Sequence, residues 1–141
     1  TGGTPSGGCW NGDGSKFYYV DGGTNPDEVF EMDCSTAYTV SALTTVGERT
    51  FNLVDTNSRD FQWSDDGTLA FAVGITNDDI EIYTASTAYD VTSLVANGTL
   101  SLNEFGHTQP SAVRFNAGGT RMYVMDNSGA TLYSYDVPGL A

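Results

Sequence analysis

Residues 61 to 83 read FQWSDDGTLAFAVGITNDDIEIY, and this stretch decides the fold. Two apolar runs flank the turn Asp65-Asp66-Gly67, and a third apolar run follows a polar turn at Thr76 to Asp79. Short apolar runs separated by turns of Gly, Asn and Asp are typical of strands joined by hairpins. The stretch therefore predicts three successive antiparallel strands.

The same pattern occurs three times along the chain. Its marks are an aromatic residue, a turn glycine, a second aromatic residue and an apolar residue two places later. In the central copy these are Trp63, Gly67, Phe71 and Val73, with counterparts Trp10, Gly14, Tyr18 and Val20 in the first copy and Phe115, Gly119, Tyr123 and Met125 in the third. A strand-rich unit that recurs about every 50 residues is typical of propeller-like arrays.

The chain of 141 residues is expected to form one all-β domain of three propeller-type blades, at residues 1–54, 55–106 and 107–141. Pro5-Ser6 aligns with Pro110-Ser111, so the glycine-rich first residues are expected to lead into a strand. The segment at 35–43 is matched by the segment at 86–94, and a fourth strand is expected after each, at 49–54 and 99–104.

The third unit has neither this segment nor a fourth strand, so eleven strands are expected where three complete blades would have twelve. Neighbouring positions in the second strands are apolar on both sides of the sheet, which indicates sheets packed on both faces. Propellers usually close with four to eight blades, so the three units are either a piece of a longer array or are completed by other chains. In both cases they leave two apolar end faces and an unpaired edge strand. We expect another chain to complete the third blade by adding a strand to that edge.

These ends predict association with copies of the same chain. A head-to-tail contact that does not close into a ring produces a filament, so a fibre is one expected outcome. The residues predicted to make the contacts are Pro5, Cys9, Trp10 and Phe17 at one end and Met122, Leu132, Tyr133 and Tyr135 at the other.

The charge balance narrows the range of partners. Five Lys and Arg stand against eighteen Asp and Glu, which gives a net charge of -13. Nucleic acid and anionic membrane surfaces are therefore unlikely partners, since both require clustered basic residues. No apolar run is long enough to insert into a membrane, and the first residues do not form a signal-peptide pattern. The many Thr, Ser, Gly, Asn and Asp residues, with few Lys, indicate an extracellular or cell-surface protein.

Two cysteines, Cys9 and Cys34, occur only in the first unit, which favours a disulfide over a role in the fold. Cys9 is expected on a first strand and Cys34 near the end of a third, about 9.5 Å apart. A direct bond needs Cα atoms within about 7 Å. The disulfide therefore requires a local bend, or it joins two subunits.

Other candidate sites have simpler interpretations. Asp78 and Asp79 are weak calcium candidates, but acidic turn residues are usually solvated, and no cofactor is predicted. His107 is the only histidine and is expected to be a polar loop residue without a catalytic partner. Glu48 and Glu104 lie in corresponding connections, with no separation that would indicate glycoside chemistry.

Two tyrosines are candidates for sugar binding, and one asparagine is a candidate for glycosylation. Tyr38 and Tyr89 recur in the repeated segment, where they either pack on their own blade or stack on a sugar ring. Asn97 begins the sequence Asn-Gly-Thr, an acceptor site for N-glycosylation in cells that carry it out.

The third unit reads FNAGGTRMYV, then a polar turn and LYSYD, and the earlier segment at 86–91 reads STAYDV. These residues resemble the surface-layer and lactonase-like (YVTN/NHL-type) β-propeller repeats, over nearly the whole chain. The resemblance implies blades and a surface or phage-borne protein of environmental type. The family includes lactonases, binding scaffolds and structural proteins, so the resemblance specifies the fold better than the activity.

The favoured function is non-enzymatic, an extracellular structural or adhesive subunit that associates with itself. The alternatives are a glycan-binding propeller module and a lactonase-like hydrolase. The hydrolase would require acidic and histidine side chains gathered at a central channel.

Overall fold

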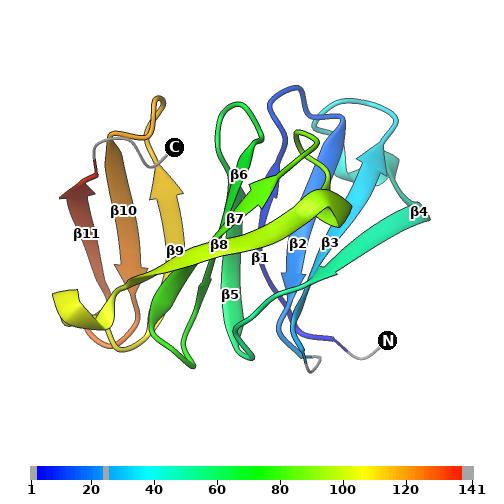
Figure 1. The fold of residues 1–141 in the computed structure, drawn as a ribbon. Helices are drawn as coiled ribbons and strands as arrows, with labels where there is room; N and C mark the ends of the chain where they lie inside the picture. The colour runs from blue at the N-terminus through cyan, green and yellow to red at the C-terminus, as the bar shows by residue number, and fades with distance from the viewer. Residues whose placement is uncertain (1–2, 24–25, 138–141) are drawn as a thin grey trace.

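The computed structural model describes residues 3–23 and 26–137, without the side chains of 45–47, and contains eleven strands in three antiparallel sheets (Figure 1). Sheet 1 is formed by β1 (Pro5–Trp10), β2 (Lys16–Asp21), β3 (Glu28–Cys34) and β4 (Leu43–Asn52). Sheet 2 is formed by β5 (Ser58–Trp63), β6 (Leu69–Gly74), β7 (Asp79–Ala85) and β8 (Leu94–Ser101). Sheet 3 is formed by β9 (Pro110–Phe115), β10 (Arg121–Asp126) and β11 (Thr131–Asp136).

Three short 3-10 helices lie in the connections. They are η1 (Val40–Ala42), η2 (Val91–Ser93) and η3 (Asn103–Phe105). Within the described ranges, no helix is long and apolar enough to cross a membrane. The all-β, antiparallel architecture predicted from the sequence is confirmed. The first strand begins at Pro5, earlier than expected, since residues 1–8 were predicted only to lead into a strand.

The fourth strands begin earlier than predicted. β4 and β8 start at Leu43 and Leu94, directly after η1 and η2, rather than at Arg49 and Thr99. Each 3-10 turn closes with a backbone hydrogen bond and delivers the next residue in an extended conformation. The sequence pattern missed this start because the polar residues of both strands resemble a loop.

The hairpin turn between β5 and β6 shows why a glycine marks each unit. Asp66 Oδ1 accepts hydrogen bonds from the amide and hydroxyl of Thr68, which closes the turn. Gly67 has φ of +71°, and a Cβ atom there would lie 2.5 Å from the ring of Tyr89. A larger residue would therefore be strained by its backbone and blocked by the ring.

The three sheets stand side by side with sheet 2 in the middle, and their first strands contact one another, β1 against β5 and β5 against β9 (Figure 1). We call the face of each sheet that points toward the preceding sheet its leading face, and the opposite face its trailing face. The trailing face of sheet 1 packs on the leading face of sheet 2, and the same arrangement joins sheets 2 and 3.

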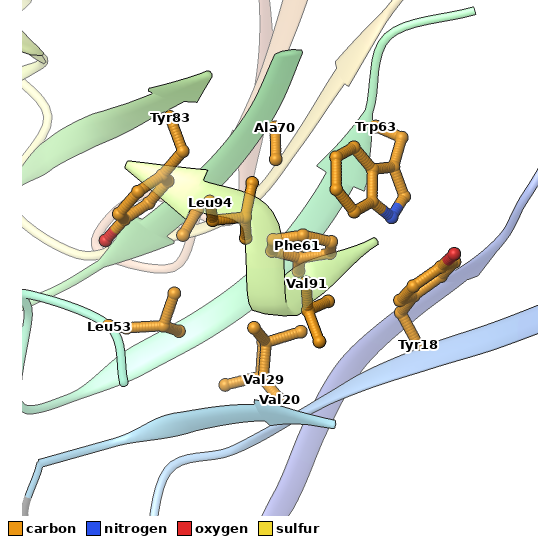
Figure 2. Packing of buried hydrophobic residues seen from close by; sticks show 11 residues of the cluster. Tyr18, Val20, Val29, Leu53, Phe61, Trp63, Ala70, Tyr83, Val91 and Leu94 are labelled. Carbon is orange, nitrogen blue, oxygen red and sulfur yellow. The ribbon is translucent and has the colours of Figure 1, made fainter. Parts of the chain in front are cut away.

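Each joint between sheets encloses an apolar core. The first core places Tyr18, Val20 and Val29 of sheet 1 against Phe61 and other residues of sheet 2, as Figure 2 shows. The second core places Phe71, Val73 and Ile80 of sheet 2 against Val113, Met122 and Val124 of sheet 3. Within residues 3–23 and 26–137, both faces of sheet 2 are therefore covered, whereas sheets 1 and 3 are each covered on one face.

Of the two alternatives for the predicted disulfide, the bond within one chain is wrong, whereas a bond between two subunits stays a prediction. Cys9 and Cys34 are both free thiols. Cys9 lies on the innermost strand and faces the first core, whereas the Cys34 thiol donates to the carbonyl oxygens of Thr36 and Thr39. Two strand spacings separate β1 from β3, too far for a bond without the bend that the sequence analysis required.

Candidate functional site

The two uncovered end faces are the first candidate site. Positions that are buried at a joint become exposed at the trailing face of sheet 3. Val73 and Ile80 of sheet 2 are 0% and 1% exposed, whereas their counterparts Met125 and Leu132 in sheet 3 are 48% and 64% exposed. Both positions remain apolar in sheet 3, but no sheet among the described residues packs over them.

The leading face of sheet 1 is the other end. Trp10 and Phe17 lie with ring centroids 5.0 Å apart, and Tyr19 stacks on Phe30 at 4.9 Å with an interplanar angle of 9°. All four rings are half-buried. Their counterparts in sheet 2 include Trp63 and Ala70, which are buried in the first core.

Only some of the predicted contact residues lie on the end faces. Trp10, Phe17 and Leu132 lie on the end faces, and Pro5 is exposed at the start of β1. Met122, however, is fully buried against sheet 2, so it cannot take part in an end contact.

The remaining three predicted residues also lie away from the end faces, although Tyr133 is 40% exposed. Cys9 faces sheet 2, and Tyr135 and Tyr133 contact His107 through their rings. The residues that were missed are Tyr123 and Met125, which alternate with Met122 along β10. The strand period of two separates the faces, but the direction of the neighbouring sheet was not evident from one sequence.

The edge of sheet 3 is the third part of this site. β11 is the last strand of a three-stranded order, β11-β10-β9, and among the described residues it pairs on one side only. Its unpaired backbone groups are a template for a further strand. Completion of this sheet by another chain stays a prediction.

An aromatic cleft at the inner-strand ends is the second candidate site. It has a volume of about 470 Å³ and lies where β1 and β5 end, beside Arg114 of β9. Its aromatic lining consists of Trp10, Tyr38, Trp63 and Tyr89. The hydroxyl of Tyr38 donates to the carbonyl oxygen of Gly12 at 2.6 Å, and the ring of Tyr38 lies edge-on to Trp10 with centroids 5.7 Å apart. The two tyrosines singled out in the sequence therefore meet in one cleft.

Polar groups share the cleft with these rings. Gln62, Asp65 and Arg114 line it. The Arg114 guanidinium pairs with the buried Asp60, where burial raises the pKa of the carboxyl against the lowering effect of Arg114. Trp63 is buried, and its indole nitrogen has no hydrogen-bond partner in the described part of the chain. A concave site with aromatic walls and a few polar groups is typical of small-ligand binding.

Cys9 also lines the cleft, but its thiol is not a ready nucleophile. Burial raises the pKa of Cys9 to about 12, against smaller effects of the Trp63 backbone and Arg114. The thiolate is the reactive form, so at neutral pH this thiol is almost wholly protonated.

His107 differs from its predicted role as a polar loop residue. It is buried, with Nδ1 3.0 Å from Asp126 Oδ2 and Nε2 2.6 Å from the hydroxyl of Tyr135. Burial alone would raise the pKa of Asp126, but hydrogen bonds from Ser128 and His107 hold it below its usual range. The group ties the connection before β9 to the strands of sheet 3, and the long sequence separation hid it.

The other candidate residues are not brought together. Asp78 lies in the turn before β7 and Asp79 is the first residue of that strand; burial raises the pKa of both, helped by Asp55 and other carboxylates. Within residues 3–23 and 26–137, no group of three or more His, Cys, Asp or Glu side chains is placed to hold a metal ion. Glu104 lies exposed in η3, and Asn97 lies exposed in β8. We therefore make no proposal of a calcium site.

No family model and no curated protein matches the chain. Solved structures do resemble it. A candidate 6-phosphogluconolactonase from Bacteroides fragilis has a TM-score of 0.69 and 12% identity over 98% of this chain. A periplasmic gluconolactonase from Pseudomonas aeruginosa has a TM-score of 0.66 and 15% identity over 99%. The Cps50 (Swd1) β-propeller domain from Myceliophteria thermophila has a TM-score of 0.60 and 10% identity over 95%.

This chain spans 39%, 37% and 38% of those three chains, respectively. The comparison corrects the expectation of a non-enzymatic protein, because two of the structures that share the fold are described as lactonases. At identities this low the likeness shows the fold alone, so it assigns no activity. The chain has the fold of part of a lactonase-like β-propeller.

Proposed function

We propose that the chain is a building block that associates head to tail with copies of itself and so extends its row of sheets. The trailing face of sheet 3 would pack on the leading face of sheet 1 of a second copy. Burial of Val73 and Ile80 in sheet 2, against exposure of Met125 and Leu132 in sheet 3, is the observation that carries this proposal. Exposed apolar side chains that lie side by side on one face are typical of contact sites.

The type of contact decides the form of the assembly. The two end faces differ, so the contact is heterologous. A rotation between copies that closes gives a ring of blades, and a rotation that does not close gives a filament. The unpaired edge of β11 adds a second point of attachment, where a strand from another chain would pair with the backbone.

A mixing experiment tests the proposal. Leu132→Glu blocks the trailing end and Phe17→Glu blocks the leading end, since a buried unpaired charge is costly. Sedimentation velocity should show that the wild type associates as its concentration rises, whereas each variant alone stays monomeric. A mixture of the two should recover one contact and form a dimer that does not grow.

Val54→Glu is the matched control, because Val54 is exposed in the connection between sheets 1 and 2 rather than on an end face. It should associate like the wild type. A wild type that stays monomeric at every concentration would refute the proposal, and so would two variants that fail to recover a dimer when mixed.

We place this assembly outside the cell, on a cell surface or on a phage particle. The support is compositional, since the chain has few Lys and many Thr, Ser, Gly, Asn and Asp residues. Secretion of the full-length protein from its native cells, measured by immunoblotting of cells and medium, tests the location.

We propose as a second candidate function that the aromatic cleft binds a neutral sugar or sugar lactone. The rings of Trp10 and Tyr38 offer apolar faces for a sugar ring, while Gln62 offers an amide for its hydroxyl groups. The similarity in fold to proteins described as lactonases supports this class of ligand.

Charge favours a neutral ligand over a charged one. Arg114 is balanced by Asp60, and Asp65 adds a further carboxylate to the cleft. The whole chain carries a net charge of -13, which repels anions. Phosphorylated sugars are therefore poorer candidates than neutral ones.

Tryptophan fluorescence tests this second function directly. The chain has two tryptophans, and both line the cleft. Titration with D-glucose, D-galactose and D-glucono-1,5-lactone should shift the emission, and Tyr38→Ala should abolish the shift. Tyr133→Ala, which alters a tyrosine far from the cleft lining, should leave it intact. A flat titration with all three probes would rule out this function.

A further inference from the structure

The joint between sheets 1 and 2 is sealed by a connecting segment, residues 86–94, which follows β7. The amide of Val91 donates to Glu31 Oε2 of sheet 1 at 3.0 Å. The hydroxyl of Tyr18 in sheet 1 donates to the carbonyl oxygen of Tyr89 at 2.6 Å. Val91 is fully buried in the first core. The segment therefore docks on the trailing face of the preceding sheet through its backbone and one apolar side chain.

The chain carries a second copy of this segment at residues 35–43. It has the same residues at the docking positions, with Tyr38 for Tyr89 and Val40 for Val91. Val91 is 0% exposed, whereas Val40 is 71% exposed. Among the described residues no sheet covers this second copy, so it presents the docking groups without their receiver.

The receiving face can be recognised by four positions on the trailing faces. In sheet 1 they are Lys16, Tyr18, Glu31 and Asp33; in sheet 2 they are Leu69, Phe71, Ile82 and Thr84; in sheet 3 they are Arg121, Tyr123, Ser134 and Asp136. Strand pairing fixes these equivalences, since Tyr18 lies opposite Glu31, Phe71 opposite Ile82, and Tyr123 opposite Ser134.

Whether these four positions are polar or apolar depends on whether the sheet receives a copy of the segment. Sheet 1 receives residues 86–94 and has a charged group or a hydroxyl at all four positions. Among the described residues the trailing face of sheet 2 receives no copy of this segment, and its Leu69 and Ile82 pack on the second core, as Phe115 and Tyr135 of sheet 3 do. Sheet 3 again has a basic residue, a tyrosine, a hydroxyl and a carboxylate. Its trailing face thus resembles the one face in the structure that receives the segment.

Sheet 3 also has an ion pair at the positions of Lys16 and Asp33, although Lys16 pairs most closely with Glu31. In sheet 3, Arg121 bonds to Asp136 Oδ1 at 2.8 Å. At the equivalent positions of sheet 1, Lys16 lies 4.0 Å from Asp33. An ion pair beside the tyrosine is therefore common to both faces and absent from sheet 2, where Leu69 and Thr84 take the two positions.

We propose that segment 35–43 of one copy docks on the trailing face of sheet 3 of a second copy and reproduces the joint between sheets 1 and 2. The Tyr123 hydroxyl donates to the carbonyl oxygen of Tyr38, as Tyr18 does to Tyr89. The amide of Val40 donates to an oxygen of Ser134 or Asp136, in place of the Glu31 carboxylate. This inference rests on the proposed self-association and specifies its register.

Removal of one hydroxyl is the first test. In Tyr123→Phe the ring remains, but the hydrogen bond across the joint is lost, so the dissociation constant of self-association should rise about fivefold. Tyr133→Phe is the matched control, because it removes a hydroxyl from the same sheet on the opposite face and should leave association unchanged. Sedimentation equilibrium measures both, and thermal unfolding confirms that each variant is folded.

Val40→Glu is the second test. A carboxylate at a position that becomes buried should weaken association by at least tenfold. Val54→Glu introduces the same side chain at a site outside the joint and should have no effect.

The outcomes separate this register from association in general. Weakening by Tyr123→Phe and Val40→Glu, with both controls unchanged, supports the inference. A wild type that associates while both test variants match their controls overturns this register but leaves self-association standing. A wild type that never associates overturns both.

Discussion

The two joints of this molecule have similar cores and different seals. The joint between sheets 1 and 2 is closed by segment 86–94, whose backbone bonds to Glu31 and Tyr18. The joint between sheets 2 and 3 is closed near the inner strands, where Asp60 accepts from the amide of Val113 and from Arg114. Apolar packing is thus shared, while the polar contacts identify which sheets fit together.

The difference shows how a repeated sheet can distinguish its neighbours. An apolar face accepts many partners of suitable volume, because apolar burial is not directional. A tyrosine hydroxyl and a carboxylate must meet particular backbone groups, since a buried polar group left unpaired is costly. The polar seal therefore sets the order of the sheets, and the predictions below test the core and the seal separately.

The largest effect is expected from truncation within the cores. Phe61 fills the first core and Phe71 the second, and both are fully buried. Phe61→Ala and Phe71→Ala should each lower the free energy of unfolding by about 3–5 kcal/mol. Urea unfolding followed by circular dichroism measures both variants.

Nearly equal losses would show that the two cores contribute equally. A loss below about 1 kcal/mol for either variant would contradict the view that both joints depend on apolar packing. Phe105→Ala provides a control and should cost less, because this phenylalanine is 49% exposed in η3.

A smaller but specific effect is expected at the seal of the first joint. Glu31 is buried and bonded to Lys16, Arg49 and the amide of Val91. Glu31→Gln keeps the shape and removes the charge, so it should lower the free energy of unfolding by about 3 kcal/mol. The half-buried Glu28→Gln on the same strand should cost less than about 1 kcal/mol, and equal losses for the two variants would argue against the seal.

The hydroxyl of Tyr18 should contribute less again. Tyr18→Phe keeps the ring in the first core and removes the hydrogen bond to Tyr89, which should cost about 1 kcal/mol. The second joint already has Phe71 at this position. Tyr123→Phe should change the stability of the isolated chain less than Tyr18→Phe does, because within the chain the Tyr123 hydroxyl bonds to the exposed Arg121 side chain, and its bond to Tyr38 forms only across the proposed contact. A Tyr18→Phe variant as stable as the wild type would show that the hydroxyl has no role in the seal.

The sequence predicted the sheets better than the contacts between them. The recurrence of Trp10, Trp63 and Phe115, with a turn glycine after each, was sufficient for an all-β, propeller-like fold, because strand period and turn chemistry are local properties. Alternation also separated Met122 from Tyr123. It could not show which of the two faced a neighbour, so Met122 was assigned to the surface and Met125 was missed.

The candidate sites were harder to predict because they join residues far apart in the chain. The aromatic cleft combines Trp10, Tyr38, Trp63 and Tyr89, and the bond between His107 and Asp126 spans 19 residues. The polar positions of the trailing faces were visible in the sequence, but only the strand pairing aligned Tyr18, Phe71 and Tyr123 with their cross-strand partners.

The smallest effect concerns the cap of the sealing segment, and it depends on pH. Asp90 accepts from the amide and hydroxyl of Thr92 at the start of η2, whereas Thr39 makes no side-chain cap bond at η1. Hydrogen bonds from Thr92 lower the pKa of Asp90 against the raising effect of burial, with help from Lys16 and Arg49. A carboxyl whose pKa is lowered in the folded state stabilises the fold above its unfolded pKa of about 3.9, and this stabilisation is lost as pH falls through the folded value.

Asp90→Asn isolates the charge, because asparagine caps a helix about as well as aspartate. It should cost about 0.5 kcal/mol at pH 7, and the difference from the wild type should shrink to zero as the pH falls below the folded pKa. Urea unfolding between pH 2 and pH 7 measures it. The exposed Glu104→Gln should show no such convergence. A difference between Asp90→Asn and the wild type that stays constant down to pH 2 would mean that the Asp90 charge does not stabilise the segment that seals the first joint.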